Sequence, residues 1–294
     1  MPARGLQEFV VDTRLGRITG LRAGDTGAPR VLALHGWLDN AASFIPLAQH
    51  LHGIELVAPD LPGHGASPHL PPGADYSFAA AVNSVLDIAD AMGWDRFSLL
   101  GHSMGAGISS LVAAACPQRI ERLVAIEALG ALADVPERTV ARLREAIAAT
   151  RALPGKSLRV FPDIAVAVRA RMAAGTQIGS RLSEPVARLL VERGVAPVEG
   201  GFVWSSDPRL TLPSMQRMTE PQVRALVAGI ECQTRVIFAD PAQPYLPDAL
   251  RRERAALLPC GELIVMQGGH HLHMEEPAAV AAAIGDFLVA SQTS

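Results

Sequence analysis

The chain has 294 residues, of which 49% are hydrophobic and 19% are charged, and its formal net charge is −3. This length suits one large domain, or a core domain with an insertion. The small net charge gives no reason to expect nucleic acid or an anionic membrane as a partner. No run of about 18 apolar residues and no signal-like N-terminus can be read. The sequence therefore predicts a soluble cytoplasmic protein, monomeric or homodimeric.

Short apolar runs alternate with alanine-rich helical patterns, which is typical of parallel strands joined by crossover helices. The first two runs meet at Leu15 and Gly16, which predicts an antiparallel hairpin at the sheet edge. The expected fold class is α/β, with an eight-stranded, mostly parallel sheet flanked by helices. The expected strands are residues 6–13, 16–24, 30–37, 55–61, 96–103, 122–128, 235–241 and 262–269. The expected helices begin near Ala41, Phe78, Met104, Pro244 and Pro277.

The alternation stops between Leu129 and Thr219, where the pattern is helical and no convincing strand is visible. A structureless connection of this length is uncommon in a compact domain. We therefore expect a core of residues 1–128 and 220–294, and a helical cap of residues 129–219 inserted after the sixth strand. The insertion has 13 Lys and Arg against 8 Asp and Glu, a balance of +5. An anionic substrate is one hypothesis for this charge, and a solvated arginine-rich helix face is the other.

A serine stands between glycines at the end of the fifth expected strand, where residues 99–107 read LLGHSMGAG. A sharp strand-to-helix turn strains the serine backbone, and Gly101 and Gly105 avoid collisions with the neighbouring backbone. The turn points the Ser103 hydroxyl outward above a helix N-terminus, where positive charge favours a developing oxyanion. Ser103 is therefore predicted to be a nucleophile, with helix capping as the alternative.

Ligands bind at the carboxyl ends of strands in open α/β sheets, so the other strand ends are the places to look for partners of Ser103. Two of them have suitable groups. His35-Gly36-Trp37 follows the third strand, and its glycine lets the backbone turn toward the nucleophile. The N–H groups of Trp37 and Met104 are predicted to form an oxyanion hole. After the last strand, residues 268–277 read GGHHLHMEEP, and His270 is the predicted general base.

The same loop contains His271 and His273, which raises the question of a metal. No cysteine stands nearby, and no two histidines four residues apart bracket a helical glutamate. We expect no metal and no cofactor, and we expect these two histidines to pack or hydrogen-bond, with a role as base the alternative. The cysteines form no motif and are expected to be small buried hydrophobic residues: Cys116, Cys232 and Cys260.

These motifs together resemble the α/β-hydrolase superfamily over the whole expected core. The resemblance rests on HGW, DLPGHGAS, GHSMG and GGHHLHMEEP, and the spacing from His270 to Pro277 is similar to the family's G-H-x-x-x-x-E-x-P ending. HGWLDNAASF, WSSDPRL and GGHHLHMEEP are most similar to the serine hydrolase-like (Kraken-type) branch. The resemblance implies that residues 129–219 cap the active site. A serine rather than an aspartate at position 103 argues against the chemistry of haloalkane dehalogenases and epoxide hydrolases, which resemble this fold but use a carboxylate nucleophile.

The acid that orients the histidine departs from the family pattern. Where much of the family has G-x-x-D after the seventh strand, this chain has Ala242 at the aligned position, with Asp240 two residues earlier. Glu127 ends the sixth strand, at a position where related branches such as some haloalkane dehalogenases have their acid. A carboxylate at the edge of the core also needs a partner. Glu127 is the favoured acid, and Asp240 is the alternative.

The expected function is hydrolysis of a small carboxylic ester or thioester through an acyl-enzyme on Ser103. The same residues could cleave a C–C bond next to a ketone, or transfer the acyl group to an alcohol or amine. An alternative of another class is a low-turnover ligand-binding protein on a hydrolase scaffold, which the departure at Ala242 supports. The expected partner is a small-molecule acyl substrate.

Overall fold

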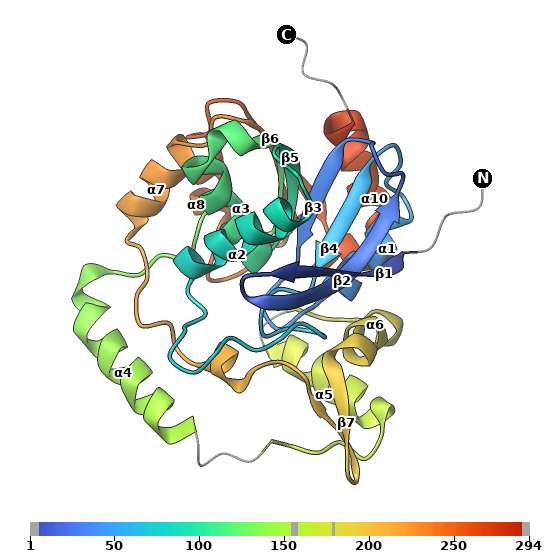
Figure 1. Cartoon of the computed structure of the whole chain (residues 1–294). Coiled ribbons are helices and arrows are strands. Elements are labelled where there is room, and N and C mark those ends of the chain that lie inside the picture. Colours follow the sequence, from blue (N-terminus) through green and yellow to red (C-terminus); the bar gives the residue numbers. More distant parts are fainter. Residues whose placement is uncertain (1–5, 154–157, 178–179, 290–294) are drawn as a thin grey trace.

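The computed structural model describes residues 6–153, 158–177 and 180–289. The strands of the main sheet are β1 (Gln7–Thr13), β2 (Gly16–Gly24), β3 (Arg30–Leu34), β4 (Glu55–Pro59), β5 (Phe97–His102), β6 (Ile120–Ile126), β9 (Gln233–Asp240) and β10 (Gly261–Gln267). These eight described strands lie in the order β1-β2-β4-β3-β5-β6-β9-β10 (Figure 1). β2 is antiparallel to β1 and β4, and the other neighbours are parallel. The expected sheet and its edge hairpin are confirmed.

Helices cover both faces of this sheet, because each central strand is apolar on both sides. On β6, Leu123 and Ala125 enter one apolar cluster, and Val124 and Ile126 enter the other. The helices around the first cluster are α2 (Phe78–Ala91), α3 (Met104–Ala115), α7 (Glu220–Ala228) and α8 (Asp248–Ala255). Those around the second are α1 (Ile45–Ala48), α9 (Leu272–Glu275) and α10 (Pro277–Ile284). The alternation along each strand thus builds a three-layer core.

Most of the expected helix starts are confirmed, and two details differ. The helix expected near Pro244 begins at Asp248, because Pro247 is its N-cap and the preceding residues form turns. The sequence analysis also missed α7, which has only nine residues and therefore little periodicity. Its start has a readable signal, the capping box between Thr219 and Gln222.

No helix in the described part of the chain combines the length and apolarity that a membrane crossing requires.

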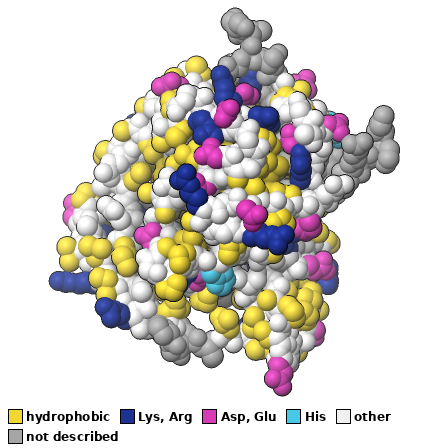
Figure 2. All heavy atoms as spheres, viewed as in Figure 1, with side chains coloured by type: hydrophobic (Ala, Val, Ile, Leu, Met, Phe, Trp, Pro, Cys, Tyr) yellow, Lys and Arg dark blue, Asp and Glu magenta, His cyan; other side chains and the backbone are white. Residues whose placement is uncertain are grey.

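Residues 129–219, which we call the inserted segment, lie between β6 and β9. They include α4 (Thr139–Ala152), α5 (Ile164–Gln177) and α6 (Glu184–Gly194). Figure 1 shows this segment below the sheet, with α4 set apart from α5 and α6. Apolar side chains exposed on α4 are Val140, Leu143 and Ile147, and Figure 2 shows hydrophobic side chains over the same lower-left part of that face.

The expectation that the inserted segment contains no strand is wrong. β7 (Val195–Val198) and β8 (Gly201–Trp204) form an antiparallel hairpin. Its turn uses Gly200 and Gly201, whose φ values of 83° and 142° favour glycine. Each strand has four residues, which is too short for a clear alternation of apolar and polar side chains.

Ion pairs and hydrogen bonds attach the inserted segment to the core. Arg193 of α6 lies 2.9 Å from the buried carboxylate of Asp60, which follows β4. In the WSSDPRL stretch, Arg209 donates to Asp207, and Asp207 also accepts a 2.7 Å hydrogen bond from the hydroxyl of Tyr76. Polar contacts that are largely buried therefore hold the inserted segment against the core.

The cysteines are less buried than expected. Cys116 and Cys232 are half-buried, and burial raises the pKa of the Cys232 thiol to about 11. Cys260 is exposed because it stands in the turn that leads into β10. The expectation of three buried cysteines is therefore wrong for Cys260 and too strong for the other two.

Gly105 provides a test of the packing between α3 and β3. A Cβ at this position would lie 1.9 Å from the carbonyl oxygen of Leu34. Gly105→Ala should lower the free energy of unfolding by about 1–3 kcal/mol through overpacking, although alanine improves helix propensity by up to about 1 kcal/mol. Gly269→Ala is the control, since a Cβ there meets no described atom within 4 Å. Equal urea midpoints for the two variants would contradict this account.

Candidate active site

Ser103 occupies a strained turn between β5 and α3. Its φ and ψ are 51° and −116°, and its N–H donates to the carbonyl of Ile126 over 2.8 Å. The turn is tight enough that a Cβ on Gly101 would lie 2.4 Å from the Cα of Ala106. The neighbouring glycines therefore have the steric role that the sequence predicts for them.

Backbone strain is concentrated around this turn. Among the described residues, positive φ values outside glycine occur at Leu38, Ser103 and Glu127, at 58°, 51° and 61°. These residues follow β3, β5 and β6, which are neighbours in the sheet. Such conformations cost about 1–3 kcal/mol each and tend to cluster at functional sites. This edge of the sheet is therefore the place to look for chemistry.

Three polar side chains form a continuous relay at this edge. The hydroxyl of Ser103 lies 2.9 Å from Nε2 of His270, and Nδ1 of His270 lies 3.0 Å from Oε2 of Glu127. Because a carboxylate only accepts hydrogen bonds, Nδ1–H donates to Glu127 and Nε2 is free to accept from Ser103. The structure thus brings together a hydroxyl, a base and an acid that the sequence places far apart.

Glu127 is buried, and its surroundings compensate for its charge. The side chain is 1% exposed, and Oε1 accepts a 2.6 Å hydrogen bond from the N–H of Ala239 on β9. The guanidinium of Arg251, on α8, lies 3.7 Å from the same oxygen. Arg251 also donates to the carbonyl of Ala239 over 2.7 Å and lies over the ring of Phe238. The sequence analysis missed Arg251, because α8 has three arginines and no pattern separates them.

Asp240, the alternative acid, points elsewhere. It is exposed at the end of β9, and its carboxylate accepts a 2.7 Å hydrogen bond from the side chain of Gln267 on β10. No hydrogen bond or ion pair joins Asp240 to His270 within the described residues. Both faces of β9 are buried from Val236 to Ala239, and Asp240 is exposed because it is the last residue of the strand, beyond this buried run.

Met104 directly follows Ser103, and Trp37 is the other residue predicted to donate to an oxyanion. Met104 is the first residue of α3, so its N–H has no acceptor within the helix and stays available. Trp37 lies in the loop after β3, with its side chain 49% exposed. Its indole N–H donates to the carbonyl of Leu210 in the inserted segment over 2.8 Å. The oxyanion loop of the sequence prediction therefore also contacts the inserted segment.

The other histidines support His270 rather than replace it. His102 Nε2 donates to the carbonyl of His270 over 2.8 Å, and His271 bonds to Asp39 and to Ser180. His273 is fully buried, with its ring 3.9 Å from that of His102. Burial lowers the pKa values of His102 and His273 well below the usual range, so both stay neutral. Their positions agree with the expected packing and hydrogen-bonding roles.

Comparisons with known proteins agree with this arrangement. The family model for the alpha/beta hydrolase fold matches residues 29–158. A serine hydrolase-like protein of Danio rerio is 30% identical over 295 residues, which cover 97% of this chain and 89% of the relative. The chain belongs to the serine hydrolase-like family of α/β-hydrolases.

Solved structures of similar proteins have the same fold along nearly the whole chain. A hypothetical protein of Pseudomonas aeruginosa is 38% identical, with a TM-score of 0.88 and coverage of 96% of this chain and 98% of that one. A thioesterase domain from the curacin biosynthetic pathway is 25% identical, with a TM-score of 0.80 and coverage of 96% and 99%. The match extends through the inserted segment as well as the core.

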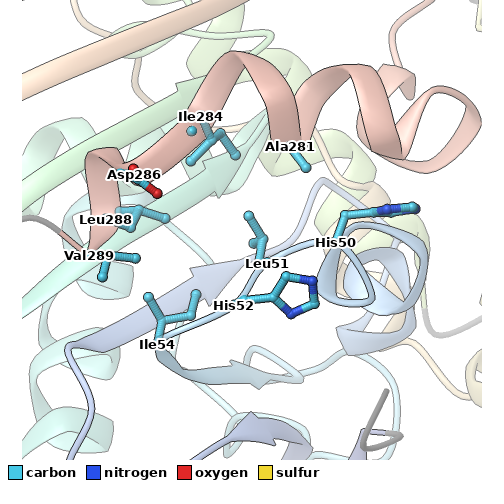
Figure 3. A pocket seen from close by; sticks show the side chains of 10 residues that line it. His50, Leu51, His52, Ile54, Ala281, Ile284, Asp286, Leu288 and Val289 are labelled. Atoms are coloured by element: carbon cyan, nitrogen blue, oxygen red, sulfur yellow. The ribbon is translucent and has the colours of Figure 1, made fainter. Parts of the chain in front are cut away.

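A separate hollow in this α/β-hydrolase lies between the loop after α1 and the C-terminal helices (Figure 3). Its lining is mainly apolar, with two histidine side chains on the loop side. The lining residues are His50, Leu51, His52, Ile54, Ala281, Ile284, Gly285, Asp286, Leu288 and Val289. Ser103, His270 and Glu127 do not line this hollow. The hollow is therefore no candidate for binding a substrate that reacts at Ser103.

Removing Arg251 should leave the buried carboxylate of Glu127 without its counter-charge. We expect Arg251→Met to lower the free energy of unfolding by about 3–5 kcal/mol, the usual cost of breaking a buried ion pair. Arg252→Met is the matched control, because Arg252 is exposed on the same helix and pairs with Asp248 at the surface. Its cost should stay within about 0.5 kcal/mol in urea unfolding. Equal losses in the two variants would show that Arg251 does not compensate Glu127.

Proposed function

We propose that this chain hydrolyses a carboxylic ester or thioester through an acyl-enzyme intermediate on Ser103. The observation that carries the proposal is the pair of hydrogen bonds made by His270. Its Nε2 lies 2.9 Å from Ser103 Oγ, and its Nδ1 lies 3.0 Å from Glu127 Oε2. Family membership supports hydrolase chemistry in general. The relay supports a serine nucleophile, with His270 as its base and Glu127 as the acid that orients it.

In the proposed reaction, Ser103 Oγ attacks the substrate carbonyl while Nε2 of His270 takes its proton. Glu127 holds Nδ1–H, fixes the tautomer and stabilises the imidazolium. The backbone N–H groups of Trp37 and Met104 donate to the oxyanion of the tetrahedral intermediate. His270 then gives its proton to the leaving group, and a water activated by His270 hydrolyses the acyl-enzyme.

The substrate we propose has an apolar acyl group. Two aromatic side chains support this choice: Trp37 is 49% exposed and Tyr245 is 50% exposed, and the ring of Tyr245 lies 6.4 Å from that of His270. Trp37 is bonded to Leu210, so residues of the inserted segment lie beside the oxyanion loop. This contact supports the role of residues 129–219 as a cap that shapes the substrate site. The thioesterase domain among the structural relatives supports testing thioesters beside oxygen esters.

The nucleophile can be tested by covalent labelling. Wild-type protein should react with a fluorophosphonate at Ser103 and should hydrolyse members of a panel of p-nitrophenyl esters and acyl thioesters. Ser103→Ala should lose the label and lower kcat/KM by about 10⁴-fold or more. Ser214→Ala, at an exposed serine, should keep both properties. Tight binding of panel members without labelling or turnover would favour a ligand-binding protein instead.

The two acids can be separated by single substitutions. Glu127→Gln should lower kcat by about 10³–10⁴-fold, because an amide no longer fixes the imidazole tautomer or stabilises the imidazolium. Asp240→Asn should stay within a few-fold of wild type, since its carboxylate bonds to Gln267. Steady-state kinetics with the best ester of the panel provide the measurement. A collapse in Asp240→Asn together with normal rates in Glu127→Gln would reverse the assignment.

A further inference from the structure

The carboxylate of Asp39 lies between the inserted segment and the loop that holds His270. Asp39 is 3% exposed and stands two residues after Trp37, in the same loop. Its Oδ1 accepts a 2.6 Å hydrogen bond from the guanidinium of Arg171 on α5. Its Oδ2 accepts from Nε2–H of His271 over 3.1 Å. One buried carboxylate therefore joins helix α5 of the inserted segment to His271, which follows the proposed base His270.

His270 is held from two directions by groups in this neighbourhood. On one side, His271 is fixed between Asp39 and the hydroxyl of Ser180, which lies 2.7 Å from Nδ1. On the other side, His102 Nε2–H donates to the backbone carbonyl of His270 over 2.8 Å. Because Nε2 carries the proton of His102, its Nδ1 is an acceptor and makes no hydrogen bond with Asp39, whose Oδ2 lies 3.9 Å away. It is the placement of His271 that depends directly on Asp39.

Arg171 is the group that compensates Asp39. The carboxylate and ring nitrogen atoms of Asp39, His102 and His271 lie within 4.8 Å of one another, a spacing that could hold a cation. The guanidinium of Arg171 already supplies a positive charge, and the interactions with His271 and Arg171 keep the pKa of Asp39 well below its usual range despite burial. The charged or titratable groups that face Asp39 are Arg171, His271, His102, His35, His64 and His273.

We propose that Arg171 is a positioning residue, which couples the docking of helix α5 on the core to the placement of His270. This inference rests on the proposed function, in which His270 is the general base. When Arg171 pairs with Asp39, the carboxylate holds His271, and the loop presents Nε2 of His270 to Ser103. Without Arg171, the buried carboxylate of Asp39 loses its guanidinium partner. The proposed base then loses its fixed position even though Ser103, His270 and Glu127 are intact.

The loss of Arg171 should act on catalysis rather than on substrate binding. A displaced His270 no longer meets Ser103 Oγ in the reacting geometry, so kcat should fall much more than KM rises. A lysine at position 171 should restore most of kcat, because a positive charge again faces Asp39. A purely structural role of Arg171 would not separate kcat from KM in this way.

The experiment compares four variants with the wild type, using the best ester found in the panel. Arg171→Met should lower kcat about 10- to 100-fold, with a smaller change in KM. Arg171→Lys should retain most of the activity, because the positive charge remains. In the double variant of Arg171→Met with Asp39→Asn, removing the anion should restore part of the lost kcat. Arg169→Met, at an exposed arginine of the same helix, should match the wild type.

Thermal unfolding of each variant separates misfolding from mispositioning. If Arg171→Met is too unstable to assay, the Lys variant and the double variant still test the charge requirement. A wild-type kcat in Arg171→Met would overturn the inference. This failure differs from failure of the proposed function, in which the wild-type protein itself would show no labelling at Ser103 and no turnover.

Discussion

The site depends on the burial of one carboxylate, that of Glu127 at the end of β6. An ionised carboxylate is costly to remove from water unless hydrogen bonds and opposite charge replace its hydration. Here Ala239 donates to one oxygen and His270 to the other, and Arg251 lies 3.7 Å away. The carbonyl of Ala239 also accepts from Arg251, so one residue of β9 bonds to both charged groups. The requirement to satisfy Glu127 thus sets the position of His270.

The same constraint explains how the inserted segment is attached. Asp39 and Asp60 are buried carboxylates of the core, and each meets an arginine of the segment, Arg171 and Arg193. The balance of +5 in residues 129–219 is therefore used in part for attachment. Neither an anionic substrate nor a solvated helix face is needed to explain these two arginines. Asp39, which contacts Arg171 of the inserted segment, also contacts His271, the residue after His270. The attachment of the segment therefore lies next to the candidate site.

Much of the fold could be read from the sequence, because its strands are apolar on both faces and are separated by helical patterns. The missed elements are short. The β7–β8 hairpin has four residues in each strand, and α7 has nine residues. At these lengths, periodicity carries little information, and the remaining signals are the Gly200-Gly201 turn and the Thr219 capping box. Such elements are stabilised mainly by their tertiary contacts.

The sequence by itself determined the candidates for nucleophile and base, because Gly101 and Gly105 are local requirements of the tight turn at Ser103 and His270 begins the histidine ending after the last strand. It left the acid open, since Glu127 and Asp240 both stand at strand ends. Only the tertiary structure decided which carboxylate meets His270: the turn at Glu127 carries its side chain across to β9, whereas Asp240 lies beyond the buried part of β9 and bonds to Gln267. The partners Arg171 and Arg251 were likewise unreadable, because contacts between distant segments leave no local pattern in a chain with many arginines.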